Sequence, residues 1–266
     1  YDYKHIFKLT NSNLKIHIPD NCIDNFKNIF SYYLDSSYNL NYDNLIHLAV
    51  MVKNGGKDFE KMLTENLDMF DRWTILDTGS TDDTIDIIKN TLVGKKKGEL
   101  FQEPFMNFRD SRNRCIDLAG NDCKFIIMLD DTYKLENDLR SFLITVRGDQ
   151  FSDSFSLYIK SNDSEYGSNR IIKSESGLRY IYKLHEVITP KNNINVIIPM
   201  NHAHIFDYRS DYMEKRTQER KQLDLKLLYE EVEENPNDPR AYYYLAQTYN
   251  GIGDFENAYK YFYLLF

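Results

Sequence analysis

Short apolar runs alternate with helical patterns between residues 45 and 129, and this alternation constrains the fold most. The predicted strands are 45–52, 73–76, 99–101 and 125–129, and the first and last are apolar almost throughout, as in strands buried on both faces. Helical spacing occupies 59–67, 84–92 and 109–119. Strand-helix-strand order with short links predicts an α/β fold of the doubly wound, Rossmann-like type: a mostly parallel sheet with helices on both faces.

An acidic turn, DTGSTDD at residues 77–83, follows the second predicted strand. A carboxylate at the end of a buried strand points into the crevice where α/β proteins bind ligands. Gly79 allows a sharp turn, and Ser80 or Thr81 is expected to cap the next helix. A phosphate-cradling loop would offer bare N–H groups and a lysine. This turn instead suits sugar or ribose hydroxyls, a base edge or a metal.

A second acidic pair, Asp130 and Asp131, follows the fourth predicted strand. Adjacent carboxylates repel each other unless a cation lies beside them, and oxygen ligands favour Mg²⁺ or Mn²⁺. The alternative is an exposed turn in which Thr132 caps the next element. Carboxyl ends of strands in a doubly wound sheet share one edge, so Asp77 and Asp130 are expected on the same rim.

Basic and amide residues lie near both turns. Arg109 and Arg112 share a helix face near its start, where a positive charge opposes the helix dipole, which favours either a bound anion or pairing with a carboxylate such as Asp110. Lys53 and Asn54 end the first strand, where they either contact a base or ribose or form a simple turn.

Two histidine motifs follow. His185 and Glu186 form a polar pair inside an aromatic segment, which indicates either a general base with an orienting or metal-binding histidine, or a hydrogen-bonded core pair. His202 and His204 alternate and are a weaker candidate for a ligand pair. No Gly-x-Ser-x-Gly elbow or nucleophilic cysteine context occurs, so hydrolase and thiol chemistry find no support.

The pattern changes after Asp149. Apolar and polar residues alternate at 154–160 and 169–173, the segment 178–188 is aromatic and β-like, and a strand is predicted at 195–200. Together these segments predict an antiparallel part of the same sheet. A long helix is predicted at 211–234 and ends before Pro236, and the next helix has Asp238 as its cap and Pro239 at its first position.

Composition limits the function. The 266 residues are 42% hydrophobic with a net charge of −8, which disfavours a general nucleic-acid binder. No apolar segment approaches the ~20 residues that span a bilayer. The start lacks a signal-peptide pattern and an initiator Met, which indicates a fragment. Cys22, Cys115 and Cys123 lack the spacing of disulfide pairs or zinc ligands, so reduced thiols are expected. Reduced thiols predict a location in the cytoplasm, which for a viral protein would be the cytoplasm of the host cell.

Residues 239–266 resemble a tetratricopeptide repeat, a helix-turn-helix of 34 residues. One apolar stripe comprises Tyr242, Leu245, Ala246 and Tyr249, and the second comprises Phe255, Ala258 and Phe262. Three parts are therefore predicted: an N-terminal extension at 1–44, an α/β domain at 45–210 and a helical segment at 211–266. The repeat favours contact with a protein or peptide, or self-association.

The motifs follow one another in the order Lys53-Asn54, first acidic turn, helix start at 108–113, second acidic turn, His185-Glu186 and repeat. This order resembles glycosyltransferase family 2 with a GT-A fold, in the branch with C-terminal repeats. The resemblance implies a nucleotide-diphosphate sugar donor (a UDP-sugar), Mn²⁺ or Mg²⁺, inversion at the anomeric carbon, and a protein, peptide or glycan acceptor. It places the donor on Val52, Lys53, Asn54, Asp77, Gly79, Ser80, Arg109, Arg112, Asn113 and Asp130.

The resemblance further places the metal on Asp130, Asp131 and His185, and makes Glu186 the base that deprotonates the acceptor hydroxyl. One position departs from the family pattern. If Asp130 begins the Asp-x-Asp motif, its second acid falls on Thr132, whose hydroxyl carries no charge. A catalytically degenerate scaffold is therefore the alternative function. A nucleotidyltransferase is a third, but it needs a glycine-rich basic loop after the first strand, which Gly55-Gly56 with Lys53 matches poorly.

Overall fold

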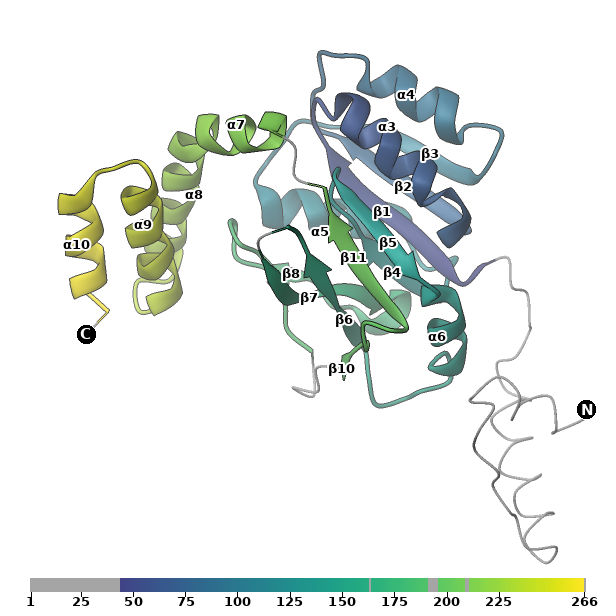
Figure 1. The fold of residues 1–266 in the computed structure, drawn as a ribbon. Helices are drawn as coiled ribbons and strands as arrows, with labels where there is room; N and C mark the ends of the chain where they lie inside the picture. The colour runs from purple at the N-terminus through teal and green to yellow at the C-terminus, as the bar shows by residue number, and fades with distance from the viewer. Residues whose placement is uncertain (1–43, 163, 191–195, 209–210, 266) are drawn as a thin grey trace, which may run out of the picture.

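The computed structural model describes residues 44–162, 164–190, 196–208 and 211–265 (Figure 1). The predicted extension at 1–44 lies outside them, apart from its last residue. The strands are β1 Ile46–Val52, β2 Arg72–Asp77, β3 Lys97–Gln102, β4 Phe125–Met128, β5 Tyr133–Asn137, β6 Ser154–Lys160, β7 Glu165–Lys173, β8 Tyr180–Ile181, β9 Val187–Ile188, β10 Val196–Ile197 and β11 Ala203–Asp207. The α-helices are α3 Gly56–Glu65, α4 Thr84–Leu92, α5 Phe108–Ala119, α6 Leu139–Thr145, α7 Asp211–Glu219, α8 Lys221–Glu234, α9 Pro239–Gly251 and α10 Phe255–Tyr263.

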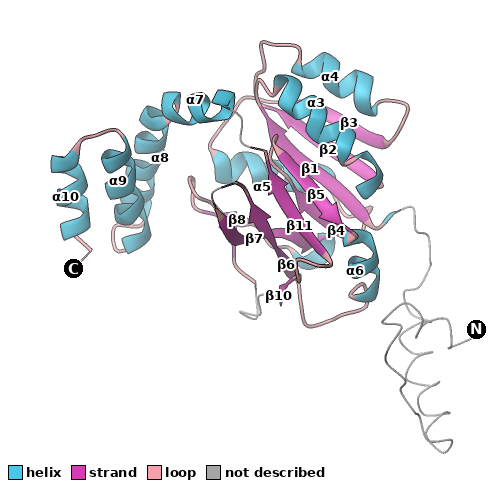
Figure 2. Cartoon of the chain, in the orientation of Figure 1, coloured by secondary structure: helices cyan, strands magenta, loops and turns pink. Residues whose placement is uncertain are grey.

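The main sheet of the described residues has the strand order β3-β2-β1-β4-β7-β6-β11-β5, and β10 adds to β6 (Figure 2). β3, β2, β1 and β4 are parallel. β7 pairs antiparallel with both β4 and β6, and β11 pairs antiparallel with β5. The predicted parallel sheet is therefore confirmed, and the C-terminal part of the same sheet is mixed, because β10 and β11 each run parallel to β6.

Helices cover both faces of the parallel half. The larger core joins side chains of the sheet to α3, α4 and α6, with Phe59 and Trp73 among its largest buried members. The second core places Cys115 and Ile116 of α5 against the opposite face. Burying a large apolar side chain stabilises a fold by about 1.5–3 kcal/mol, so both faces contribute strongly.

Strand register brings both acidic turns to one rim. Val52 pairs with Asp77 across β1 and β2, and Ala49 pairs with Met128 across β1 and β4. Because β1, β2 and β4 are parallel, their carboxyl ends meet at the same edge of the sheet. Asp130 follows β4 by two residues, so the predicted placement of both turns on one rim is confirmed.

Several predicted elements are wrong in detail. The β-like segment 178–188 contains only β8 and β9, two residues each, with an irregular loop between them. The predicted strand 195–200 reduces to Val196–Ile197 in the described residues. The predicted helix 211–234 is interrupted at Arg220, and the chain changes direction between α7 and α8 (Figure 1). β5 and α6 were not predicted.

The helical segment packs beside the sheet domain (Figure 1). Asp238 caps α9, accepting a hydrogen bond from Arg240 N at 2.9 Å, and Pro239 is at the first turn, as predicted. Leu245 and Ala246 are fully buried, whereas Phe255 is 69% exposed. α9 packs between α8 and α10.

The loop 182–186 joins the helical segment to the sheet domain. Leu184 is buried in the same apolar cluster as Leu228 of α8 and Leu245 of α9. Lys183 N donates to a carboxylate oxygen of Glu231, and Lys183 O accepts from Phe108 N at the start of α5. None of the described helices is long and apolar enough to cross a membrane.

Candidate functional site

The first acidic turn holds itself together locally. Asp77 is 1% exposed, and its carboxylate accepts from Gly79 N at 3.2 Å and Ser80 N at 3.1 Å. Gly79 has φ +102°, a conformation that side-chain-bearing residues rarely adopt. The predicted cap by Ser80 or Thr81 is wrong, because Asp82 accepts from Thr84 N at 3.1 Å instead.

The end of β1 is tied to this turn. Asn54 has φ +52°, its N–H donates to Ser80 Oγ at 2.8 Å, and its Oδ1 accepts from Thr81 N at 2.7 Å. Val52 O accepts from Thr78 N at 2.9 Å. The Lys53 side chain is exposed. The structure therefore assembles the predicted donor-binding residues Val52, Lys53, Asn54, Asp77, Gly79 and Ser80 into one surface at the rim.

The second acidic turn is held by distant arginines. Asp130 Oδ1 pairs with Arg112 at 2.5 Å, and Asp130 Oδ2 pairs with Arg170 at 3.2 Å. Burial alone would raise the pKa of Asp130, but the two guanidinium groups outweigh burial and hold that pKa well below its usual range. At neutral pH, Asp130 is therefore a charged, doubly paired carboxylate.

Asp131 has a different partner. Its Oδ2 pairs with Arg216 of α7 at 2.9 Å, and Arg216 also donates to Lys53 O at 2.9 Å. Burial raises the pKa of Asp131, and Arg216 only partly opposes this effect. One guanidinium thus links α7 to the carboxyl end of β1 and to the turn after β4.

Arg112 joins the second turn to Glu186. Its Nε donates to Glu186 Oε1 while its second terminal nitrogen holds Asp130. Arg112 is 6% exposed, and its Nη1 has no hydrogen-bond partner among the described residues. The Glu186 side chain is 12% exposed. The interpretation of Arg112 as pairing with a core carboxylate is therefore the one that the structure bears out.

The Thr132 hydroxyl takes part in a buried hydrogen bond. It donates to Asp207 Oδ1 at 2.7 Å, and both residues are buried. Asp207 belongs to β11, which lies beside β5 in the sheet. The third residue of the acidic motif is therefore a hydrogen-bond donor to a carboxylate from another strand.

The residues at this rim do not fit a divalent metal as they stand. A Mg²⁺ or Mn²⁺ site needs several oxygen ligands with carboxylate charge left to neutralise. Both oxygens of Asp130 are paired with arginines, and Asp131 is paired with Arg216. In the described part of the chain, no three His, Cys, Asp or Glu side chains gather as metal ligands. The predicted trio of Asp130, Asp131 and His185 is therefore not assembled.

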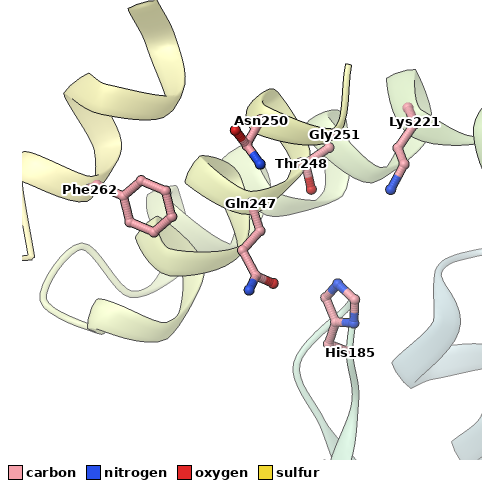
Figure 3. Close-up of a pocket in the computed structure, with 7 residues that line it drawn as sticks. All are labelled: His185, Lys221, Gln247, Thr248, Asn250, Gly251 and Phe262. Atoms are coloured by element: carbon pink, nitrogen blue, oxygen red, sulfur yellow. The ribbon is translucent and has the colours of Figure 1, made fainter. Parts of the chain in front are cut away.

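His185 faces the helical segment. Its ring stacks on Tyr244 of α9 with centroids 3.9 Å apart. Figure 3 shows the ring directed toward α8 and α9, where it borders a pocket of about 340 Å³ lined also by Lys221, Gln247, Thr248, Asn250, Gly251 and Phe262. Desolvation, with help from Arg240, Arg220 and Lys221, lowers the pKa of His185 to about 4, so the ring is neutral at pH 7. A metal-binding role for His185 is not supported.

Two further predicted donor residues have structural partners. Arg109 pairs with Asp110 at 2.7 Å and with Glu234 of α8 at 3.4 Å, so its guanidinium is committed to the helical segment. The Asn113 amide exchanges two hydrogen bonds with the backbone of Tyr180, at 2.8 and 2.9 Å. The structure therefore does not bring these two side chains to the rim.

The predicted histidine pair is not assembled either. His204 lies on β11, 3.5 Å from Glu136, whereas His202 lies before the strand and its ring contacts Phe142. Sequence reasoning missed Arg170, Arg216 and Asp207. Arg170 could have been noticed as a charge beside the apolar residues Ile171 and Ile172, but no local pattern distinguishes Arg216 from the other charges of α7.

Known proteins resemble this chain in sequence and in fold. No model of a known protein family matches it. The SPbeta prophage-derived glycosyltransferase SunS of Bacillus subtilis strain 168 and the glycosyltransferase SunS of Bacillus phage SPbeta are each 24% identical over an alignment of 229 residues, with 81% of this chain and 52% of each relative covered. The chain thus spans about half the length of these curated relatives.

A solved structure agrees with this likeness. The crystal structure of S. aureus TarS 1–349 in complex with UDP-GlcNAc has a TM-score of 0.51 at 12% identity, over 77% of this chain and 72% of that chain. The chain has the fold of a glycosyltransferase. The predicted fold class is therefore confirmed, including a mixed sheet that is followed by helices.

Proposed function

We propose that this protein is a glycosyltransferase that moves a sugar from a nucleotide-diphosphate sugar to an acceptor hydroxyl, with inversion at the anomeric carbon. One observation carries the proposal: Arg112 joins Asp130 at the rim of the sheet to Glu186 in the loop 182–186. A carboxylate beside the ligand crevice of an α/β sheet is well placed to act as a general base.

A UDP-sugar is the proposed donor. Support comes from the SunS relatives, which are named as glycosyltransferases, and from the TarS fold, which was solved with UDP-GlcNAc. The base and ribose would lie on the surface formed by the ends of β1 and β2, where Asn54 and Asp77 order the turn. Lys53 adds a positive charge at that surface.

Glu186 is the proposed catalytic residue. As the acceptor oxygen attacks the anomeric carbon, the bond from that carbon to the diphosphate breaks, and the acceptor proton passes to a Glu186 oxygen. The electron pair of the broken bond leaves with the nucleoside diphosphate. Arg112 acts as a positioning residue, because its fork fixes Glu186 relative to Asp130. No step is assigned to a metal.

The acceptor is proposed to be a protein, peptide or glycan that approaches beside the helical segment. The loop that carries Glu186 also carries His185, whose ring borders the pocket of Figure 3. The lining of that pocket by amide and hydroxyl side chains suits hydrogen bonding to a polar chain.

Substitution of Glu186 tests this function. We expect Glu186→Gln to bind UDP as wild type does and to lose transfer by about 10²–10⁴-fold, because the amide accepts the Arg112 hydrogen bond and cannot take a proton. UDP release with a panel of UDP-sugars and acceptors measures the rate. Glu175→Gln, at an exposed surface position, is the matched control. Wild-type turnover in Glu186→Gln would refute the assigned base.

A catalytically degenerate scaffold is the second candidate function. It is favoured by Thr132, which stands where the family motif carries a second acid, and by the arginine partners of both aspartates. In that case the protein would bind UDP weakly or not at all, and wild type and Glu186→Gln would be equally inactive with every donor.

A further inference from the structure

We propose that the guanidinium of Arg216 takes the place of the divalent metal at this site and binds the donor diphosphate directly. This inference rests on the proposed function, because it assumes a nucleoside diphosphate at the rim. The family resemblance implies a metal at this site. The side chains that would have to bind the metal are instead paired with arginines.

Charge balance is the first argument. The carboxylates that would hold a metal or act as a base are Asp130, Asp131 and Glu186. The guanidinium groups paired with them are Arg112, Arg170 and Arg216. Three negative charges minus three positive charges leave no net charge within this set of described ion pairs. In the absence of a bound diphosphate, a divalent cation placed here would add two uncompensated positive charges next to buried arginines.

Thr132 supplies the second argument. A neutral hydroxyl at the motif position removes one negative charge where a divalent cation needs it. The hydroxyl is moreover engaged with Asp207 at 2.7 Å. Asp130 is balanced by two arginines, so Asp131 is the only member of this motif with a single arginine partner among the described ion pairs. A singly charged group matches one carboxylate better than a doubly charged ion does.

The place of Arg216 is the third argument. Its side chain is 30% exposed, against 7% for Arg112 and 12% for Arg170, so it is the most accessible guanidinium of the three. It contacts both Asp131 and the carbonyl of Lys53. These contacts fix it between the end of β1, where the nucleotide is proposed to bind, and the acidic motif to which the family resemblance assigns the metal.

The guanidinium group of Arg216 has the chemistry that binding a diphosphate requires. A guanidinium is planar, stays charged at every physiological pH and donates two parallel hydrogen bonds to phosphate oxygens. Arg216 can therefore bridge Asp131 and a diphosphate as a metal ion would. It would stabilise the negative charge that develops on the leaving diphosphate, since fixed donors aimed at developing charge lower a barrier.

Calorimetric titration of the full chain with UDP tests the inference, once in EDTA and once in Mn²⁺. We expect dissociation constants for wild type that agree within about threefold between the two conditions. Arg216→Gln should weaken binding about 10- to 100-fold in both, because a charged hydrogen-bonding partner of the diphosphate is lost. Arg216→Lys should keep part of the affinity, and Lys215→Ala, which removes an exposed charge on the same helix, should match wild type.

The outcomes separate the two proposals. UDP binding by wild type only in Mn²⁺ would overturn the role of Arg216 and leave the glycosyltransferase proposal standing. If Arg216→Gln bound UDP with wild-type affinity, the role of Arg216 would likewise be overturned and the glycosyltransferase proposal would stand. Absence of UDP binding in both conditions would overturn both proposals. Thermal unfolding of each variant shows that it is folded, and Arg216→Lys retains the charge if the neutral variant does not fold.

Discussion

The two acidic turns at the rim are alike in sequence and differ in what holds them. Asp77 accepts hydrogen bonds from backbone groups two and three residues away. Asp130 and Asp131 are paired with guanidinium groups 18 and 85 residues away. The first turn is therefore a local structure that a short segment can specify, whereas the second depends on the whole fold. Substitutions should expose that difference.

The largest effect is expected at the shared arginine of the second turn. Arg112→Met should destabilise the fold by about 3–5 kcal/mol, because it leaves the largely buried carboxylate of Glu186 without its arginine and Asp130 with Arg170 alone. Urea unfolding measures the loss. Arg114→Met, which breaks a more exposed pair with Glu103, should destabilise the fold far less. A similar small loss in both variants would mean that the second turn does not depend on its distant partners.

The next effect carries a pH dependence. Asp130→Asn should cost about 2–3 kcal/mol at pH 7, because the ion pairs with Arg112 and Arg170 lose their negative partner. The arginines lower the pKa of Asp130 in the folded protein below its unfolded value of 3.8. Its contribution is therefore complete well above pH 3.8 and is lost as the pH falls through the folded pKa. The difference between wild type and variant should narrow below about pH 4.

Urea unfolding of both proteins at several pH values measures this difference. Burial lowers the pKa of His47 from 6.5 to about 4, so both proteins should lose stability as the pH falls across that window. That loss is common to both and cancels in the comparison. A gap that stayed constant down to pH 3 would show that Asp130 is not the group held by the arginines.

A smaller effect is expected within the first turn. Gly79→Ala should cost about 1–2 kcal/mol, because an alanine at φ +102° is strained although no neighbouring atom lies near its Cβ. Gly167→Ala, in the exposed part of β7 and equally free of neighbours, should stay within about 0.5 kcal/mol of wild type. Equal costs at the two glycines would contradict the account of the first turn as a backbone structure.

The smallest effect on stability is expected for Asp77→Asn. The amide keeps one oxygen acceptor for the turn, so the loss should be about 1 kcal/mol. UDP affinity should nevertheless fall about tenfold if this residue orders the donor surface. Thermal unfolding and UDP titration of the same sample measure both quantities. Unchanged UDP affinity would remove Asp77 from the donor site.

Local patterns explain what could be predicted. The apolar runs of β1, β2 and β4 and the turn around Asp77 carry their information within a few residues, so the parallel sheet and its rim were predictable. The cap of α9 by Asp238 and Pro239 was predictable for the same reason.

Long-range partners explain the rest. Nothing near Arg216 in sequence indicates that it meets Asp131, and nothing near Arg112 indicates that its partners are Asp130 and Glu186. The segment 178–188 has the aromatic composition of a strand, yet contacts of Lys183 and Leu184 with the helical segment hold most of it as a loop. Tertiary contacts outweighed β-propensity there.

The loop 182–186 has a consequence for how the molecule can be controlled. Glu231 of α8 receives the Lys183 N–H, and Arg240 of α9 donates to His185 O at 2.5 Å, so two helices outside the sheet domain fix the residues before Glu186. A chain shortened after residue 219 would keep Arg216 and the nucleotide surface but lose both anchors. If the protein has the proposed function, a partner protein that displaced α8 or α9 would therefore slow sugar transfer while the bound nucleotide stayed in place.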